Sequence, residues 1–163
     1  MTATDKLLDN AEQYASEIDH GDLPLPPASK VAVLACMDAR LDPHALLGLA
    51  EGDAHVIRNA GGVVSDDALR SLAISQNLLG TEEVVLIHHT DCGMLTFTDD
   101  EFADRLESET GERPDWRAHA FADLEQDLRE GLDRIRSSPF VTRKGAIRGF
   151  VYEVESGRLR EVV

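Results

Sequence analysis

Val31-Ala-Val-Leu-Ala35, followed by Cys36, and Val84-Val-Leu-Ile87 are two short, uninterrupted apolar runs. Runs of this kind are typical of strands buried on both faces of a parallel sheet. Between them, His55-Val-Ile-Arg58 predicts a weaker strand. Ser65 is the expected N-cap of a helix over residues 65–79, with two aspartates in its first turn and Gly80 beyond its end. Strands that alternate with helices indicate βαβ units, so this stretch predicts an α/β fold with a mainly parallel sheet.

The rest of the chain extends the same pattern. Thr98-x-x-Glu101 is a capping box that opens a helix ending near Gly111, and the spacing of apolar residues over 121–135 predicts another helix. Residues 148–154 predict the last parallel strand, and 159–162 a possible antiparallel edge strand. We therefore expect the sheet to be flanked by helices.

The N-terminal part of the chain differs from this core. Apolar residues recur at helical spacing over residues 4–20, and Gly21 follows as a stop signal, so an amphipathic helix is expected there. Residues 23–27 (Leu-Pro-Leu-Pro-Pro) form an extended connector, since proline fixes its own backbone and restricts its predecessor. With 163 residues, the chain has the size of one domain, 1–163, with residues 1–27 as a helical, Pro-rich arm whose apolar face needs a partner surface.

Charge and composition exclude several classes of function. With 16 Lys plus Arg against 31 Asp plus Glu, the net charge of −15 argues against binding to nucleic acid or to an acidic membrane surface. No apolar run approaches the ~20 residues that span a bilayer, and the first residues lack the basic and apolar regions of a signal peptide. We expect a cytoplasmic protein, in which Cys36 and Cys92 stay reduced and serve catalysis or metal binding rather than a disulfide.

The two cysteines lie at equivalent places in the pattern. Cys36 follows the first apolar run, and His88-His89-Thr-Asp-Cys92 follows the second. Because the carboxyl ends of parallel strands line one crevice, we expect Cys36, one histidine and Cys92 to converge. Two thiolates and one imidazole with an open fourth position are the pattern of a catalytic zinc site. The alternative is a buried thiol near a core histidine, but matching cysteines at two strand ends favour zinc.

Two histidines compete for the metal. His89 is favoured because its three-residue step to Cys92 forms a natural chelating loop. His88 continues the strand, so its side chain should lie on the opposite face, as a packed and hydrogen-bonded core residue.

Asp38 and Arg40 stand just past the first strand. Two residues apart, they could pair beside the metal, and a carboxylate held ionised by arginine can accept a hydrogen bond from zinc-bound water. Taken alone, they could also be an ordinary helix-entry aspartate and a surface ion pair. His44 is a candidate proton shuttle because of its ordinary pKa near ~6.5, although a plain surface histidine is the simpler interpretation.

These motifs together resemble a known family. Cys36-x-Asp38-x-Arg40 with His89-x-x-Cys92-Gly93 is similar to the paired signature of the β-class carbonic anhydrases, and Arg58-Asn59-Ala60-Gly61 resembles the segment after that family's second strand. The resemblance covers roughly residues 28–154 and is nearest to the small bacterial members. It implies a four-stranded parallel core, and a homodimer or dimer of dimers in which each N-terminal helix packs on its neighbour. The family commonly has glycine where His88 stands.

The resemblance also implies an activity and a cofactor. Zn²⁺ on Cys36, His89 and Cys92 would support reversible hydration of carbon dioxide to bicarbonate and a proton through a zinc-bound hydroxide. Asp38 would accept the hydrogen bond of the hydroxide, and Arg40 would keep Asp38 charged and off the metal. Gly61 and Gly62 would allow the backbone to approach the substrate cleft closely, or would simply form a tight turn.

The sequence motifs are also compatible with other functions. The same zinc site could hydrolyse a related heteroallene such as carbon disulfide. The motifs do not determine which of the two substrates, carbon dioxide or carbon disulfide, the site prefers. A noncatalytic zinc or thiol redox sensor would leave Asp38 and Arg40 without a role. A nucleotide-binding α/β module is disfavoured because the chain has neither G-x-G-x-x-G nor a P-loop lysine.

Overall fold

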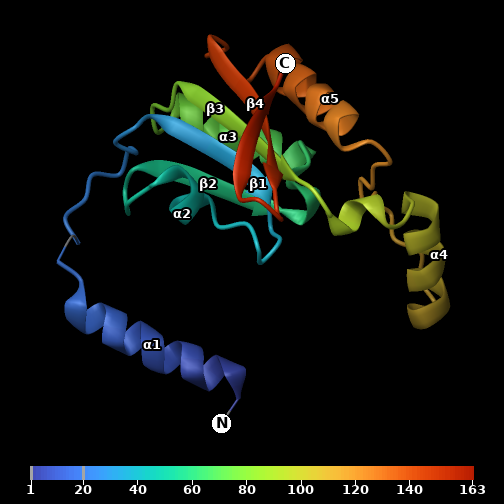
Figure 1. Ribbon diagram of the computed structural model, residues 1–163, viewed down its shortest axis with the longest axis horizontal. Helices are drawn as coiled ribbons and strands as arrows, with labels where there is room; N and C mark the ends of the chain where they lie inside the picture. The colour runs from blue at the N-terminus through green and yellow to red at the C-terminus, as the bar shows by residue number, and fades with distance from the viewer. Residues whose placement is uncertain (1, 20) are drawn as a thin grey trace.

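The computed structural model describes residues 2–19 and 21–163 and contains a five-stranded sheet in the order β2-β1-β3-β4-β5. Four strands pair in parallel, and β5 runs antiparallel to β4 at one edge (Figure 1). The predicted mainly parallel sheet with an antiparallel edge strand is thereby confirmed. The strands are β1 Val31–Cys36, β2 Ala54–Asn59, β3 Glu83–His89, β4 Ala146–Glu153 and β5 Arg158–Val162.

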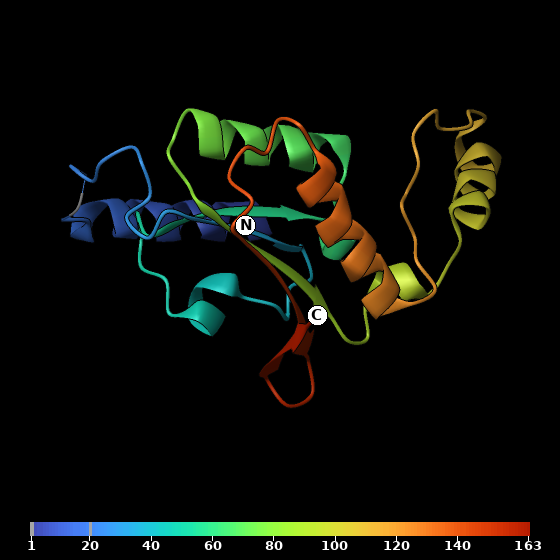
Figure 2. The same ribbon diagram turned by 90° about the horizontal axis from the view of Figure 1, so that it is seen from above.

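Helices cover both faces of the sheet. α3 and α5 lie over one face, and the short α2 lies on the other (Figure 2). A separate hydrophobic cluster packs on each face of the sheet. Successive residues of β1 and β3 point alternately into one cluster and the other, so the apolar runs are buried on both faces. The helices are α1 Ala3–Glu17, α2 Pro43–Leu47, α3 Asp66–Asn77, α4 Asp99–Thr110 and α5 Leu124–Ser137, with 3₁₀ turns η1 Ala60–Gly62 and η2 Gly93–Leu95.

Several helix ends follow the predicted signals. Thr98 and Glu101 form the expected capping box at the start of α4, and Gly111 follows its end in the left-handed conformation. α5 begins later than the apolar spacing suggests. The side chain of Asp123 accepts hydrogen bonds from the first backbone N–H groups of the helix, so Phe121 lies in the preceding loop.

Two further helices differ from the expectations. α1 ends at Glu17 rather than at residue 20, because Ile18 adopts an extended backbone; residue 20 itself lies outside the described residues. The five-residue α2 is absent from the predictions. Asp42 caps its start and Gly48 follows its end at φ 65°, but one helical turn is too short to show a hydrophobic period.

The N-terminal arm stands away from the sheet. The extended connector carries α1 past the β2 edge of the sheet (Figure 1), and none of the described α1 residues is buried. Its apolar side chains remain in solvent, with Leu7 65% and Leu8 59% exposed. The Tyr14 hydroxyl is hydrogen-bonded to the Glu51 carboxylate, which ties the helix to the loop before β2. The rest of the same chain therefore does not cover the apolar face of α1.

Within the part of the chain that the structure describes, no helix has both the length and the apolar character needed to cross a membrane.

Candidate metal centre

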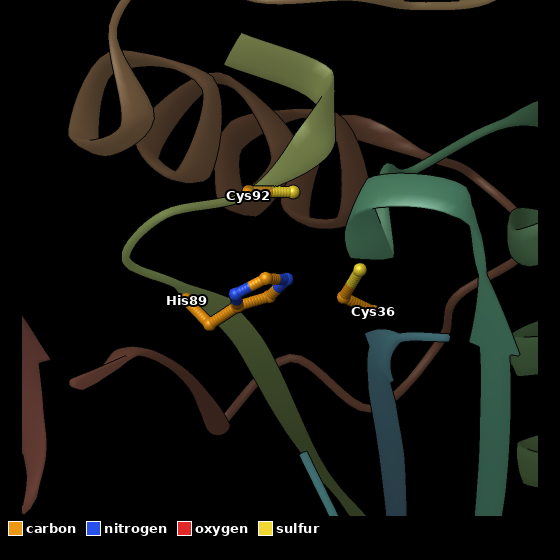
Figure 3. Close-up of side chains that lie close together, drawn as sticks. All are labelled: Cys36, His89 and Cys92. Carbon is orange, nitrogen blue, oxygen red and sulfur yellow. The ribbon is translucent and has the colours of Figure 1, made fainter. Parts of the chain in front are cut away.

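Cys36, His89 and Cys92 converge at the carboxyl end of the sheet (Figure 3). Cys36 ends β1, His89 ends the adjacent strand β3, and Cys92 lies in the loop that leads from β3 into η2. One donor atom from each side chain lies within 4.8 Å of the other two, and all three residues are buried. The predicted convergence of the two strand ends is confirmed, because parallel pairing of β1 with β3 brings their last residues to one edge.

The ring of His89 is oriented for a ligand. Its Nδ1 lies 2.8 Å from the backbone carbonyl of Thr90, and because a carbonyl only accepts, Nδ1 carries the proton. Nε2 is buried and has no hydrogen-bond partner among residues 2–19 and 21–163. A buried, lone-pair-bearing nitrogen without a partner is costly by itself but is what a metal ligand presents, so the site fits a metal ion.

The two thiols add negative charge to this site. A hydrogen bond from Cys92 lowers the pKa of Cys36 to about 4; burial opposes this shift, and the backbone N–H groups of Asp38 and Gly61 add to it. The pKa of Cys92 is raised, by its hydrogen bond to Cys36 and by burial, so the pair retains one proton. A bound divalent cation would take the place of that proton, since cysteine binds metals as the thiolate.

Asp38 and Arg40 form a bidentate ion pair beside the two thiols and the imidazole. Arg40 Nε donates to Asp38 Oδ1 at 3.0 Å, and Nη2 donates to Oδ2 at 2.8 Å. These side-chain bonds, with a backbone N–H bond from Arg40, hold the pKa of Asp38 well below its usual range, so the carboxylate stays ionised. Asp38 Oδ2 lies 3.7 Å from His89 Nε2. An ionised carboxylate thus borders the atom that is free to bind a metal.

Gly61 and Gly62 form the turn that closes one side of the site. Both have positive φ, 82° and 65°, which favours glycine. A Cβ on Gly62 would lie 2.8 Å from the backbone nitrogen of Cys36 and 2.9 Å from the carbonyl oxygen of Ile87. The residue therefore packs directly on the carboxyl-end parts of β1 and β3 in a tight turn, and this close approach is to the strands.

His88 lies on the opposite face from His89, as the strand alternation predicts. It is 1% exposed, and its Nε2 donates a hydrogen bond to Asp127 Oδ2 on α5 at 2.7 Å. Its ring stacks on that of Phe121, with the ring centroids 5.5 Å apart. The prediction of a packed, hydrogen-bonded core residue is confirmed.

His44 lies on α2, with its side chain 55% exposed and Nδ1 4.0 Å from Asp42 Oδ1. It is a surface histidine, the simpler of the two interpretations.

Two residues around the site have contacts that the sequence did not reveal. The Arg58 guanidinium donates to the backbone carbonyls of Cys36, Asp38 and Leu41, at 2.7 to 3.0 Å, and so shapes the loop that carries the dyad. Asp91 forms an ion pair with Arg40, Nη1 to Oδ2 at 2.7 Å. Arg58 belongs to the Arg58-Asn59-Ala60-Gly61 segment, and Asp91 lies between the expected ligands His89 and Cys92. Their hydrogen-bond partners are distant in sequence and meet them only in the folded chain.

Comparison with known proteins agrees with this geometry. Residues 31–159 match the family model for carbonic anhydrase. The chain is 56% identical to the protein named β-carbonic anhydrase 1 of Mycobacterium tuberculosis (strain H37Rv) over 162 residues, 99% of each chain. It is 36% identical to a carbon disulfide hydrolase of Acidianus, over 96% of this chain and 87% of that protein. The crystal structure of carbonic anhydrase from Streptococcus mutans superposes with a TM-score of 0.94 at 42% identity, covering 100% of this chain and 99% of that one. The chain belongs to the β-class carbonic anhydrase family.

Proposed function

We propose that this protein catalyses the reversible hydration of carbon dioxide to bicarbonate and a proton, with Zn²⁺ held by Cys36, His89 and Cys92. The observation that carries the proposal is the buried set of three donor atoms next to a carboxylate that arginine keeps ionised. Family membership supports the same activity.

The donor set supports zinc in particular. Two sulfur ligands and one imidazole are a combination that zinc accepts, and three protein ligands are characteristic of catalytic sites, whereas structural sites fill all four positions with Cys or His. Within the described residues, this is the one group of His, Cys, Asp and Glu side chains close enough to hold an ion. When bound, zinc supplies the Lewis acidity that lets water ionise near neutral pH.

The protein's own residues orient the reaction. Hydration joins the oxygen of one water molecule to the carbon of carbon dioxide and releases one proton. Asp38 accepts the hydrogen bond of the attacking oxygen, which leaves a lone pair of that oxygen directed at carbon. Arg40 binds both oxygens of Asp38, so the carboxylate stays charged and is restrained from becoming a ligand itself. We assign Asp38 as the catalytic acceptor and Arg40 as the residue that holds it.

Gly61 and Gly62 serve in this scheme as the backbone wall of the substrate cleft. The missing side chain of Gly62 lets the turn lie against Cys36 and Ile87, and the Gly61 N–H stabilises the Cys36 thiolate. A side chain at Gly62 would press on the backbone of the two strand ends, and one at Gly61 would press on the side chains of Met94, Val63 and Phe121.

The working form that we propose is a homodimer, or a dimer of dimers, in the cytoplasm. The exposed apolar stripe of α1 and its Pro-rich connector support an arm that packs on a second copy of the chain. In this account residues 1–163 act as one zinc domain, of which 1–27 is the arm.

Carbon disulfide hydrolysis is the competing activity, because carbon disulfide hydrolases at 34% to 36% identity share most of this chain. The test is to give the zinc-loaded protein each substrate, following carbon dioxide hydration by stopped flow and carbon disulfide loss by product sulfide. We expect rapid hydration and little sulfide. The reverse preference would assign the chain to carbon disulfide. Inactivity on both, with zinc bound, would favour a zinc or thiol sensor.

A further inference from the structure

Asp91 lies in the loop between His89 and Cys92, and its side chain reaches across to the dyad. Its carboxylate Oδ2 accepts a hydrogen bond from Arg40 Nη1 at 2.7 Å, and its backbone carbonyl accepts a second one from Arg40 Nη2 at 3.0 Å. The Arg40 guanidinium therefore binds Asp38 on one edge and Asp91 on the other. It bridges the loop after β1, which carries the dyad, and the loop after β3, which carries the metal ligands.

The backbone of Asp91 explains only part of its presence. Asp91 has a φ of 54°, in the left-handed region, where glycine, asparagine and aspartate are the favoured residues. Glycine or asparagine would satisfy that turn equally well. Of the three, only aspartate also places a negative charge next to Nη1 of Arg40. The pair lies at the surface, where the side chain of Asp91 is 80% exposed and that of Arg40 is 46% exposed.

The rest of the loop is already anchored by other groups. Thr90 donates its N–H to the carbonyl of Tyr152 at 2.9 Å, and its hydroxyl accepts the N–H of Val154 at 3.0 Å. The dyad loop is separately held by Arg58. The Asp91–Arg40 contacts are therefore not needed to hold either loop to the sheet. What they add is a fixed distance between the Asp38 carboxylate and the loop that carries His89 and Cys92.

We infer that Asp91 is a positioning residue for the reaction: through Arg40 it fixes where Asp38 stands relative to the metal ligands. The inference rests on the proposed function for its catalytic consequence, but the tether itself is a property of the protein alone. Without Asp91, the Asp38–Arg40 pair persists and moves as a unit relative to the ligand loop, so the carboxylate spends less time in the productive position.

Three variants of the zinc-loaded, full-length protein separate the carboxylate from the turn. Asp91→Asn keeps the size and the left-handed preference but removes the charge, and Asp91→Gly relieves the backbone. Asp67→Asn is the matched control, because Asp67 pairs with Arg70 at 2.9 Å in a similarly exposed ion pair on α3. We expect kcat/KM for carbon dioxide to fall about fivefold in both Asp91 variants, the size of a strong exposed pair, and to stay unchanged in the control.

Two readouts distinguish positioning from a general structural role. Exchange of the Arg40 Nη1 protons with solvent, followed by NMR and assigned by their absence in Arg40→Lys, should speed up in Asp91→Asn and not in Asp67→Asn, because Nη1 donates to Asp91 Oδ2. In an Arg40→Ala background, Asp91→Asn should cause no further fall in rate, since the residue acts through Arg40.

Several results would overturn the inference. The first is an Asp91→Asn protein in which both kcat/KM and the solvent exchange of Arg40 are unchanged. The second is a loss of rate on Asp91→Asn that is as large in the Arg40→Ala background as in the wild type. The third is loss of zinc from Asp91→Asn, which would mean that Asp91 supports only the loop of metal ligands. If the wild type does not hydrate carbon dioxide, the proposed function fails, and the exchange measurement alone decides whether the tether exists.

Discussion

His88 and His89 are neighbours in β3, yet their rings serve opposite faces of the sheet. Nε2 of His89 has no hydrogen-bond partner among the described residues and lies near the two cysteines, whereas Nε2 of His88 is bound to Asp127 and the His88 ring stacks on Phe121. The difference follows from strand alternation alone, which turns successive side chains to opposite sides. One ring therefore lies in the candidate metal site, and the other attaches α5 to the sheet.

Substitutions at these two histidines should have different consequences. His89→Ala should lose zinc and activity together, because only two protein ligands remain. His88→Ala should keep zinc but lower the free energy of unfolding by about 2–4 kcal/mol, from the lost hydrogen bond and the cavity. Metal analysis beside urea denaturation checks both. Full zinc occupancy in His89→Ala would contradict the ligand assignment.

Arg40 controls what Asp38 can do. In Arg40→Ala the carboxylate loses both side-chain hydrogen bonds, while its Oδ2 remains 3.7 Å from His89 Nε2 in the starting geometry. We expect it to turn to the zinc and occupy the fourth position. Zinc content should then stay unchanged while the hydration rate falls at least a hundredfold, about 2.7 kcal/mol in barrier.

Asp38→Ala is the companion variant to Arg40→Ala. It cannot close the site, so a cobalt-substituted sample should keep the spectrum of the wild type, whereas cobalt-substituted Arg40→Ala should not. An Arg40→Ala enzyme with an undiminished rate would remove the dyad from the mechanism.

At the scale of elements, the turn η1 has to pack closely against the ends of β1 and β3. Gly62→Ala combines an unfavourable positive φ, about 1–2 kcal/mol, with contact against backbone atoms, about 1–3 kcal/mol more. Gly80→Ala is the control, since Gly80 has a φ of 76° but open space around its Cβ position. Urea midpoints should therefore fall further for Gly62→Ala. Equal shifts would show that close approach contributes nothing.

The sequence predicted the elements whose signals are local. The apolar runs 31–35 and 84–87 identified the two central strands, and the capping box at Thr98 placed the start of α4. Phe121 was assigned to a helix because its spacing fits, but the Asp123 cap starts α5 after it. One helical turn such as α2 has no period to detect.

The candidate site shows the same division. Cys36, His89 and Cys92 could be grouped from topology, since parallel strands share one carboxyl edge. The contacts of Asp91 and Arg58 could not, because each joins segments far apart in sequence and depends on loop geometry that only the folded chain sets.

At the scale of the whole molecule, α1 remains outside the fold. Its apolar stripe is exposed, and the Pro-rich connector holds it beyond the β2 edge. Deleting residues 1–22 should leave the sheet and its zinc site intact but abolish the dimer, giving monomers or aggregates through the surface that α1 would cover. Sedimentation of the full-length and truncated chains tests this. A full-length protein that sediments as a stable monomer would refute the proposed assembly.

We propose that the protein hydrates carbon dioxide with zinc held by Cys36, His89 and Cys92. The most direct test of this proposal is a titration of the metal-free protein with zinc, in which the stopped-flow rate of carbon dioxide hydration is measured after each addition. We expect the rate to rise linearly and to stop rising at one zinc ion per chain, and Cys92→Ala to show no such rise. A rate that is independent of zinc, or no hydration at full zinc occupancy, would contradict it.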